Sequence, residues 1–167
     1  MRTYNLSKSV RDDLFEKASK YLSGVKSKDL KIAESDDGMF AIVFDSKAGL
    51  YLGRKNENRD FLFPLLKDEV ILPKIPTVVV DSGAVKFVCN GANVMRPGIN
   101  KVEGEDFDKG SLILVKEQKY GKAISVGRSM LSKSELESSS KGPVVENLHY
   151  VGDKFWEGLK EVTESTK

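Results

Sequence analysis

Apolar residues recur at helical spacing near the start of the chain and then gather in short runs bounded by turn-forming residues. Between residues 6 and 22 they fall three or four positions apart, which predicts an amphipathic helix that ends at Gly24. Three apolar runs follow at 30–33, 39–44 and 50–52, with turn signals between them. This pattern predicts an antiparallel meander of about three or four strands, covered on one face by the helix.

The segment 61–71 is ambiguous. Pro64 can occupy the first turn of a short helix over 64–68, because the missing N–H is not needed there. Two prolines, Pro73 and Pro76, then stiffen the chain into an extended segment. We take this segment as the boundary between two parts of the chain.

A second pattern begins with the β-branched run 77–80, which predicts a buried strand. Asp81 or Ser82 can cap the helix that follows, and Asn90-Gly91 supplies the left-handed position that ends it. The apolar positions of this helix recur at helical spacing, at Ala84, Val85, Val88 and Cys89. The predicted order is strand, short helix and strand, closed by a turn at Pro97-Gly98.

After this helix the predicted strands are short and are separated by glycine-bearing turns. Such spacing is typical of a small closed or half-closed barrel with helical insertions. One insertion is predicted at 131–137, where serines can cap a short helix. The overall prediction is an α+β protein with an N-terminal domain at 1–72, a barrel domain at 73–157 and a tail at 158–167.

Charge is uneven along the chain, although the net charge is only +2. Residues 82–102 carry three basic side chains and no acid, and residues 109–133 carry six basic side chains and one acid. Residues 134–167 reverse this balance, with seven acids and four bases. The middle of the chain can therefore present a positive face to a polyanion, or its lysines can be scattered solvated positions.

Enzymatic chemistry finds little support in the residue types. The chain has one cysteine and one histidine, so an ordinary structural zinc site or an internal disulfide cannot form from them. We interpret Cys89 as a core residue and the acidic run 103–108 as a solvated loop, because it lacks the glycine and final glutamate of a calcium loop. No phosphate-binding glycine loop is present. The predictions are no enzyme activity, no cofactor and no metal.

The location expected from the sequence is the reducing cytoplasm. The N-terminus lacks the apolar core of a signal peptide, and no apolar run approaches the roughly 18 residues that a membrane span requires.

Several motifs resemble the PUA domain, an RNA-binding module named after pseudouridine synthases and archaeosine transglycosylases. They are Asp81-x-Gly83-Ala84-Val85, Gly91-Ala92-Asn93-Val94, Arg96-Pro97-Gly98-Ile99, and the later stretches 109–115, 123–128 and 144–150. The last stretch, with Gly152-Asp153-Lys154-Phe155-Trp156 behind it, resembles the translation-factor family called multiple copies in T-cell malignancies, in an archaeal-type form. In that family a pre-PUA domain precedes the PUA domain.

The resemblance implies an RNA groove bordered by the first helix of the PUA domain, the strand after it and the final strand. The positions that match are Ser82, Gly83, Lys86, Asn90, Gly91, Asn93, Arg96, Arg128, His149 and Tyr150. Lysine and arginine would bind phosphate, Asn93, His149 and Tyr150 would contact or stack on unpaired bases, and amides near Ser82 and Gly83 could receive a phosphate. Arg96, in a turn before Pro97, could instead cap a carbonyl, and without the resemblance the glycines are equally well explained as turn and packing residues.

What the resemblance implies about function is a non-enzymatic RNA-binding protein of translation initiation or ribosome recycling. Its expected partners are tRNA or rRNA, the small ribosomal subunit and a separate initiation-factor-like protein, with no membrane. Two alternatives stay open: an adaptor for an RNA-modification enzyme, and a protein-interaction module that uses the apolar surface of residues 1–72.

Overall fold

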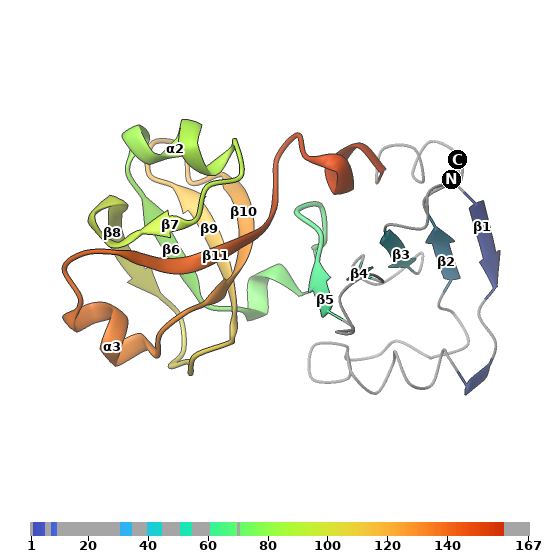
Figure 1. Ribbon diagram of the computed structural model, residues 1–167, viewed down its shortest axis with the longest axis horizontal. Coiled ribbons are helices and arrows are strands. Elements are labelled where there is room, and N and C mark those ends of the chain that lie inside the picture. Colours follow the sequence, from blue (N-terminus) through green and yellow to red (C-terminus); the bar gives the residue numbers. More distant parts are fainter. Residues whose placement is uncertain are drawn as a thin grey trace. The chain divides into compact units, whose positions relative to one another are not determined.

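The structure is a computed structural model that describes part of the chain. The described residues are 2–5, 8–9, 31–34, 40–44, 51–54, 61–69 and 71–158. They fall into two compact units, the first formed by Met1–Lys74 with Lys154–Lys167 and the second by Ile75–Asp153. Figure 1 shows the elements of each unit.

The described part of the first unit contains an antiparallel sheet of five strands in the order β1-β2-β3-β4-β5. The strands are β1 (Arg2–Asn5), β2 (Lys31–Glu34), β3 (Phe40–Phe44), β4 (Tyr51–Arg54) and β5 (Phe61–Pro64). The three strands of the predicted meander, β2 to β4, pair in chain order and antiparallel. The helix predicted at 6–22 lies outside the described residues, apart from the helical Lys8 and Ser9.

The structure corrects the expected number of strands in this unit and decides the ambiguous segment that begins at Phe61. The sheet has five strands, where about three or four were expected, because β1 pairs with β2. Arg2–Asn5 lacks the alternation of apolar and polar residues that would predict a strand. Pro64 does not open a helix: it ends β5, opposite Tyr51 of β4. Proline has no N–H to donate to a neighbouring strand. It is tolerated there because β5 is the last strand in the described sheet, where one edge needs no hydrogen-bond partner.

Aromatic packing joins the end of β5 to the segment that follows residue 153. The rings of Phe63 and Phe155 meet edge to face, with their centroids 5.6 Å apart. The ammonium of Lys67 lies 4.7 Å from the ring centroid of Trp156. Segments ninety residues apart in the sequence thus form one core in the first unit.

The second unit is a strongly curled, half-barrel sheet with short helices (Figure 1). Its strands are β6 (Thr77–Val80), β7 (Val94–Met95), β8 (Ile99–Glu103), β9 (Leu112–Glu117), β10 (Ala123–Ser129) and β11 (Pro143–Tyr150). They lie in the order β7-β11-β10-β9-β6-β8, and only the β6–β9 pair is parallel. The predicted α+β class, with a small half-closed barrel and short helices, is therefore confirmed.

Helix α2 (Ser82–Val88) forms where the sequence predicts it. The carboxylate of Asp81 accepts a hydrogen bond from the amide of Ala84 at 3.0 Å, which satisfies one of the free amides at the helix start. Val88 is buried in the core, and the other residues of the apolar stripe are half-buried against it. Gly91 has φ +94°, the left-handed conformation expected after the helix.

Helix α3 (Lys133–Ser138) is confirmed as well. Ser132 and Glu135 form a reciprocal capping box, and Leu136 is buried in the core. The apolar core that α2 and α3 cover is contributed mainly by the inward faces of the sheet. It consists of Val78, Val80, Val88, Val94, Ile99, Phe107, Ile113, Val115, Ile124, Leu136, Val144 and Val145.

Candidate functional site

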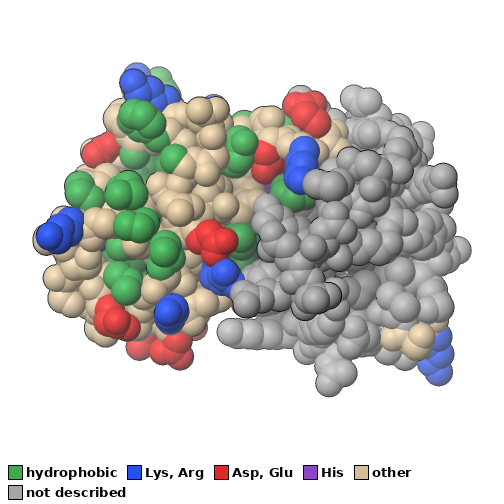
Figure 2. Space-filling view, viewed as in Figure 1, with side chains coloured by type: hydrophobic (Ala, Val, Ile, Leu, Met, Phe, Trp, Pro, Cys, Tyr) green, Lys and Arg blue, Asp and Glu red, His purple; other side chains and the backbone are tan. Residues whose placement is uncertain are grey.

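An exposed surface runs along α2 and over the turn that follows it. Ser82, Gly83, Lys86, Asn90 and Gly91 are all exposed there, as the sequence analysis expects of a binding surface. Figure 2 shows apolar side chains exposed among charged ones on the second unit. The surface along α2 combines one cation, Lys86, with polar and apolar groups.

The most prominent feature of this surface is the pair formed by Lys86 and Phe87. The Phe87 ring is 59% exposed, and the ammonium of Lys86 lies 5.1 Å from its centroid. Lysine over an aromatic face is a favourable arrangement that also holds the ring and the charge together. The pair can therefore offer one planar apolar surface and one phosphate ligand at the same place.

Tyr150, at the end of β11, closes the surface beside Gly91. A Cβ added to Gly91 would lie 3.3 Å from Cε1 of the Tyr150 ring. The close approach and the positive φ together explain why glycine stands here. Tyr150 is half-buried, and its ring lies next to the end of α2.

Asn147 of β11 holds this region in place. Its Nδ2 donates to the carbonyls of Val88 and Ala92 at 2.9 and 3.0 Å, and its Oδ1 accepts from the buried Ser125 hydroxyl at 2.8 Å. The backbone amide of Asn147 donates to Oδ1 of Asn93 at 3.0 Å. Asn93 is exposed, but its carbonyl oxygen already has a partner, so its free amide donor is what it can offer a ligand.

Arg96 is used inside the fold. Its Nε donates to the carbonyl of Leu136 at 2.9 Å and its Nη1 to the carbonyl of Ile99 at 3.3 Å. This is the carbonyl-capping role that the residues alone leave open. The structure therefore does not support a phosphate contact by Arg96 in this conformation.

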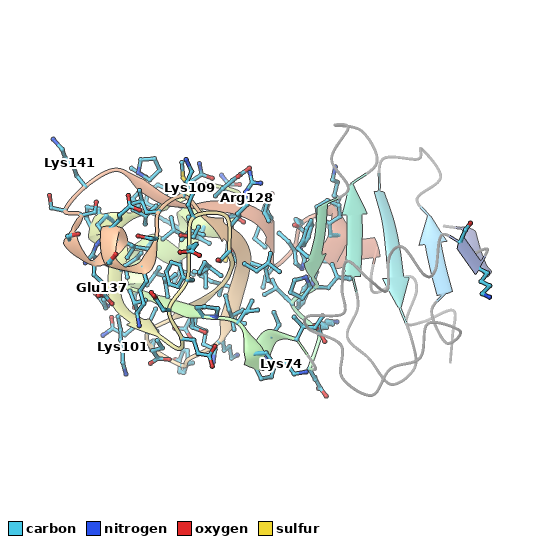
Figure 3. The ribbon with its side chains drawn as sticks, turned by 90° about the horizontal axis from the view of Figure 1, so that it is seen from below. Lys74, Lys101, Lys109, Arg128, Glu137 and Lys141 are labelled. Atoms are coloured by element: carbon cyan, nitrogen blue, oxygen red, sulfur yellow. The ribbon has the colours of Figure 1, made fainter. Side chains whose placement is uncertain are left out.

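Arg128 is not brought to the α2 surface. Ser125 and Gly127 of β10 pair with the core residues Val115 and Ile113, so strand alternation places Arg128 on the opposite face of the sheet. There its guanidinium forms an ion pair with Glu146 at 2.7 Å. Figure 3 labels both Arg128 and Lys109. The residues that follow them are hydrogen-bonded to each other, because the amide of Gly110 donates to the carbonyl of Ser129.

His149 is also not available to a ligand. Its side chain is 0% exposed, and Nδ1 lies 2.9 and 3.0 Å from the two carboxylate oxygens of Asp153. Asp153 in turn accepts from the amide of Tyr150 at 2.9 Å. A buried ring cannot stack on a base, so we correct the expectation for His149: it orders the end of β11 beside Tyr150.

The expected phosphate position at the start of α2 is not supported either. The amide of Ala84 is already satisfied by the Asp81 carboxylate, which puts a negative charge where a phosphate would lie. A Cβ on Gly83 would lie 3.4 Å from the same carboxylate. The available cation on α2 is Lys86, one turn further along.

Sequence reasoning missed two exposed aromatic residues, Phe87 and Tyr120. Phe87 lies outside the apolar stripe of α2, and Tyr120 lies in a turn between two lysines. At both positions the pattern predicts a polar residue. The aromatic residue found there could therefore have indicated a binding surface. Tyr120 is 70% exposed, and the ammonium groups of Lys119 and Lys122 lie 5.1 and 5.9 Å from its ring centroid.

The turn that carries Tyr120 is organised by Glu117, the last residue of β9. Its carboxylate accepts from the amide of Tyr120 at 2.9 and 3.1 Å and from the amide of Lys122 at 2.9 Å. The pKa of Glu117 is lowered from its ordinary value of 4.5, chiefly by the hydrogen bond from the backbone amide of Lys122 and further by those from Tyr120 and Lys119, against the opposing effect of burial. The charged carboxylate therefore favours the folded turn.

This predicts an acid dependence of stability that Glu117→Gln should remove. Because the folded-state pKa is lowered, the contribution of Glu117 is complete above pH 4.5 and is lost as the pH falls through the lowered value. Wild type should exceed Glu117→Gln in stability at neutral pH, and the difference should narrow in acid. Chemical denaturation at several pH values measures this. Glu105→Gln, in an exposed loop, is the control, and a difference that stays constant with pH would contradict the prediction.

The described part of the chain offers little support for a reactive cysteine or a metal site. Cys89 is half-buried against the core, and burial raises the pKa of its thiol, which disfavours a reactive thiolate. Among the residues that the structure describes, no group of three His, Cys, Asp or Glu side chains could hold a metal ion. No helix in the same residues is long and apolar enough to cross a membrane.

The curled sheet with α2 packed over its core, and with the exposed Lys86–Phe87 pair on that helix, defines a PUA-type protein. The family model for the PUA domain matches residues 76–151. In solved structures, a PUA domain from Aeropyrum pernix K1 superposes with a TM-score of 0.75, at 24% identity, over 95% of this chain and 91% of the other. The resemblance in fold extends beyond the matched domain to nearly the whole chain.

Curated relatives assign the family. An uncharacterized protein of Methanocaldococcus jannaschii is 37% identical over 131 residues, covering 78% of this chain and 77% of its own. Translation machinery-associated protein 20 of Saccharomyces cerevisiae is 35% identical over 103 residues, covering 58% of this chain and 57% of its own. The chain belongs to this family of PUA-domain proteins, which also includes the malignant T-cell-amplified sequence proteins.

Proposed function

We propose that the protein is a non-enzymatic RNA-binding protein of the translation apparatus and that it binds RNA through the surface of α2. The observation that carries this proposal is the Lys86–Phe87 pair, an exposed cation over an exposed ring, inside a PUA domain. Proteins bind unpaired RNA by stacking bases on aromatic rings and pairing phosphates with cations. The pair provides both.

The surroundings of the pair favour a polyanionic ligand. Between Ser82 and Val102 the sequence has no acidic residue. Gly91 is exposed and lies against the Tyr150 ring, and Asn90 adds an exposed amide that can donate to phosphate or base oxygens. We therefore propose a surface made of Lys86, Phe87, Asn90, Gly91 and Tyr150, and we leave Arg96, Arg128 and His149 out of it.

The names of the relatives support a place in translation. Fungal relatives are named translation machinery-associated protein 20. We propose tRNA or small-subunit rRNA as the ligand, and the small ribosomal subunit together with a separate initiation-factor-like protein as partners in the cytoplasm. Initiation or ribosome recycling would be the step served.

We also propose a division into an N-terminal domain, a PUA domain and a tail, close to the predicted bounds 1–72, 73–157 and 158–167. The two compact units support a boundary near residue 74. Phe155 packs on Phe63 of the first unit, so we revise the end of the PUA domain to residue 153.

Lys86→Glu tests the proposed function. The variant should bind tRNA or single-stranded rRNA fragments about tenfold more weakly, because a phosphate ligand is replaced by a like charge. The dependence of the logarithm of affinity on the logarithm of salt concentration should become shallower by about one unit. Fluorescence anisotropy across a series of salt concentrations measures both quantities.

Lys141→Glu is the matched control, since Lys141 is exposed before β11, at the opposite end of this strand from Tyr150. It changes the net charge equally and should leave affinity nearly unchanged. If wild type shows no salt-dependent affinity for any of these RNAs, or if the two variants behave alike, the α2 surface is not an RNA-binding site.

A further inference from the structure

The turn between β9 and β10, Gln118–Lys122, has the composition of a second ligand surface. Its tip carries one aromatic ring, Tyr120, at 70% exposure, and two lysine ammonium groups within 6 Å of that ring. The turn itself contains no acidic residue, and the carboxylate of Glu117, which precedes it, is buried and accepts from backbone amides. The exposed side chains of the turn are therefore an aromatic ring, two ammonium groups and the neutral amide of Gln118.

The backbone of this turn is held more firmly than an exposed loop usually is. The amide of Glu117 donates to the carbonyl of Lys122 at 2.9 Å, and the amide of Gly121 donates to the carbonyl of Glu117 at 3.1 Å. With the two amides bound by the Glu117 carboxylate, these bonds fix the chain on both sides of Tyr120. An exposed ring on a fixed backbone loses little freedom when a flat ligand stacks on it.

The fold places the turn beside the start of α2. The amide of Gln118 donates to the carbonyl of Val80 at 2.9 Å, and Val80 pairs with Glu117 across the parallel strands. Val80 is followed by Asp81, the cap of α2. The Gln118 side chain also bonds to that of Asn100 at the start of β8. The turn and the α2 surface thus lie at the same end of the sheet.

The distance along α2 from its first residue, Ser82, to Lys86 is short. Lys86 is four residues beyond Ser82, which is about 6 Å along a helix axis. Small RNA-binding barrels contact about four or more nucleotides of a strand. One strand can therefore reach from the Lys86–Phe87 pair to the turn.

We propose that the β9–β10 turn is a second RNA contact, in which Tyr120 stacks on an unpaired base while Lys119 and Lys122 bind the flanking phosphates. This proposal rests on the proposed function and assigns the turn a preference for single-stranded over double-stranded RNA. A base in a duplex is already stacked on its neighbours and has no free face for the ring.

Tyr120→Ala in the full chain tests the stacking. Affinity for a labelled single-stranded oligouridylate should fall about tenfold, the loss typical of removing one base-stacking aromatic residue. Tyr120→Phe should bind like wild type, because the ring is kept. Affinity for a blunt RNA duplex of equal length should be the same in all three proteins, and circular dichroism checks that each is folded.

The lysines are tested by the double variant Lys119→Gln with Lys122→Gln. For binding to the oligouridylate, the slope of the logarithm of affinity against the logarithm of salt concentration should be shallower by about 1.4. This corresponds to the loss of two phosphate contacts at about 0.7 each for a single strand. The control carries Lys109→Gln with Lys141→Gln, the same loss of charge before β9 and before β11, at the far end of the sheet from the turn. This control should keep the wild-type slope.

The outcomes separate the two proposals. If Lys86→Glu weakens binding while Tyr120→Ala does not, the turn is not a contact and the proposed function stands. If Tyr120→Ala lowers the affinity for the duplex and for the single strand equally, stacking of Tyr120 on an unpaired base is excluded. If wild type binds no RNA, both proposals fail.

Discussion

Gly127→Ala is expected to destabilise the second unit by about 3 kcal/mol or more, one of the two largest effects that we predict for this protein. A Cβ at this position would lie 2.5 Å from Cγ1 of Val145 and closer still to the carbonyl oxygen of Glu146. The register of β10 and β11 shifts between Val126 and Gly127, so the glycine stands at an irregularity where the backbones approach. The neighbouring strand would have to move.

Gly83→Ala is the matched control for this substitution. Its added Cβ meets Asp81 at 3.4 Å, an ordinary contact, and alanine is favoured over glycine in a helix by up to about 1 kcal/mol. Trp156, the only tryptophan, lies in the first unit, so its fluorescence does not report on the second. Chemical denaturation followed by circular dichroism or by amide hydrogen exchange of β10 and β11 measures the effect. Equal stability of the two variants would contradict the prediction.

Asn147→Ala is expected to have the second large effect, a loss of about 2–3 kcal/mol. The substitution leaves the Ala92 carbonyl and the buried Ser125 hydroxyl without the partner that Asn147 provides, while the Val88 carbonyl keeps only the amide of Gly91. Unsatisfied groups cost about 1–3 kcal/mol each where they are buried. RNA affinity should fall as well, because the same bonds hold the chain around Gly91. Denaturation and anisotropy measurements on one preparation give both quantities.

Asn147→Asp sharpens this test. Aspartate has the same shape, but a carboxylate oxygen would face the two carbonyls that the Nδ2 group now donates to, so this variant should be less stable than Asn147→Ala at neutral pH. Asn90→Ala, at an exposed position after α2, is the control for stability. If Asn147→Asp is as stable as wild type, the hydrogen bonds of Asn147 do not hold the loop.

The local features of the fold could be predicted because their causes are local. The Asp81 cap, the apolar stripe of α2, the positive φ of Gly91 and the capping box of α3 all depend on residues within four positions of one another. β1 could not be predicted, because its only reason to be extended is pairing with β2, some thirty residues away.

The candidate site was harder to predict because burial is set by distant residues. His149 and Tyr150 are neighbours in one strand and point to opposite faces, and only the register with β10 decides which is buried. Arg96 reaches a carbonyl forty positions later, at Leu136. Phe87 and Tyr120, in contrast, break a local pattern and could have been found.

The first unit is discontinuous in the sequence, which has a consequence for the order of events during synthesis. Residues from Lys154 onward group with the first 74, and Phe155 supplies a ring to their core. A nascent chain can complete the second unit as soon as Asp153 has left the ribosome, whereas the first must wait for the residues that come after. The part of the chain made first is thus the last to mature.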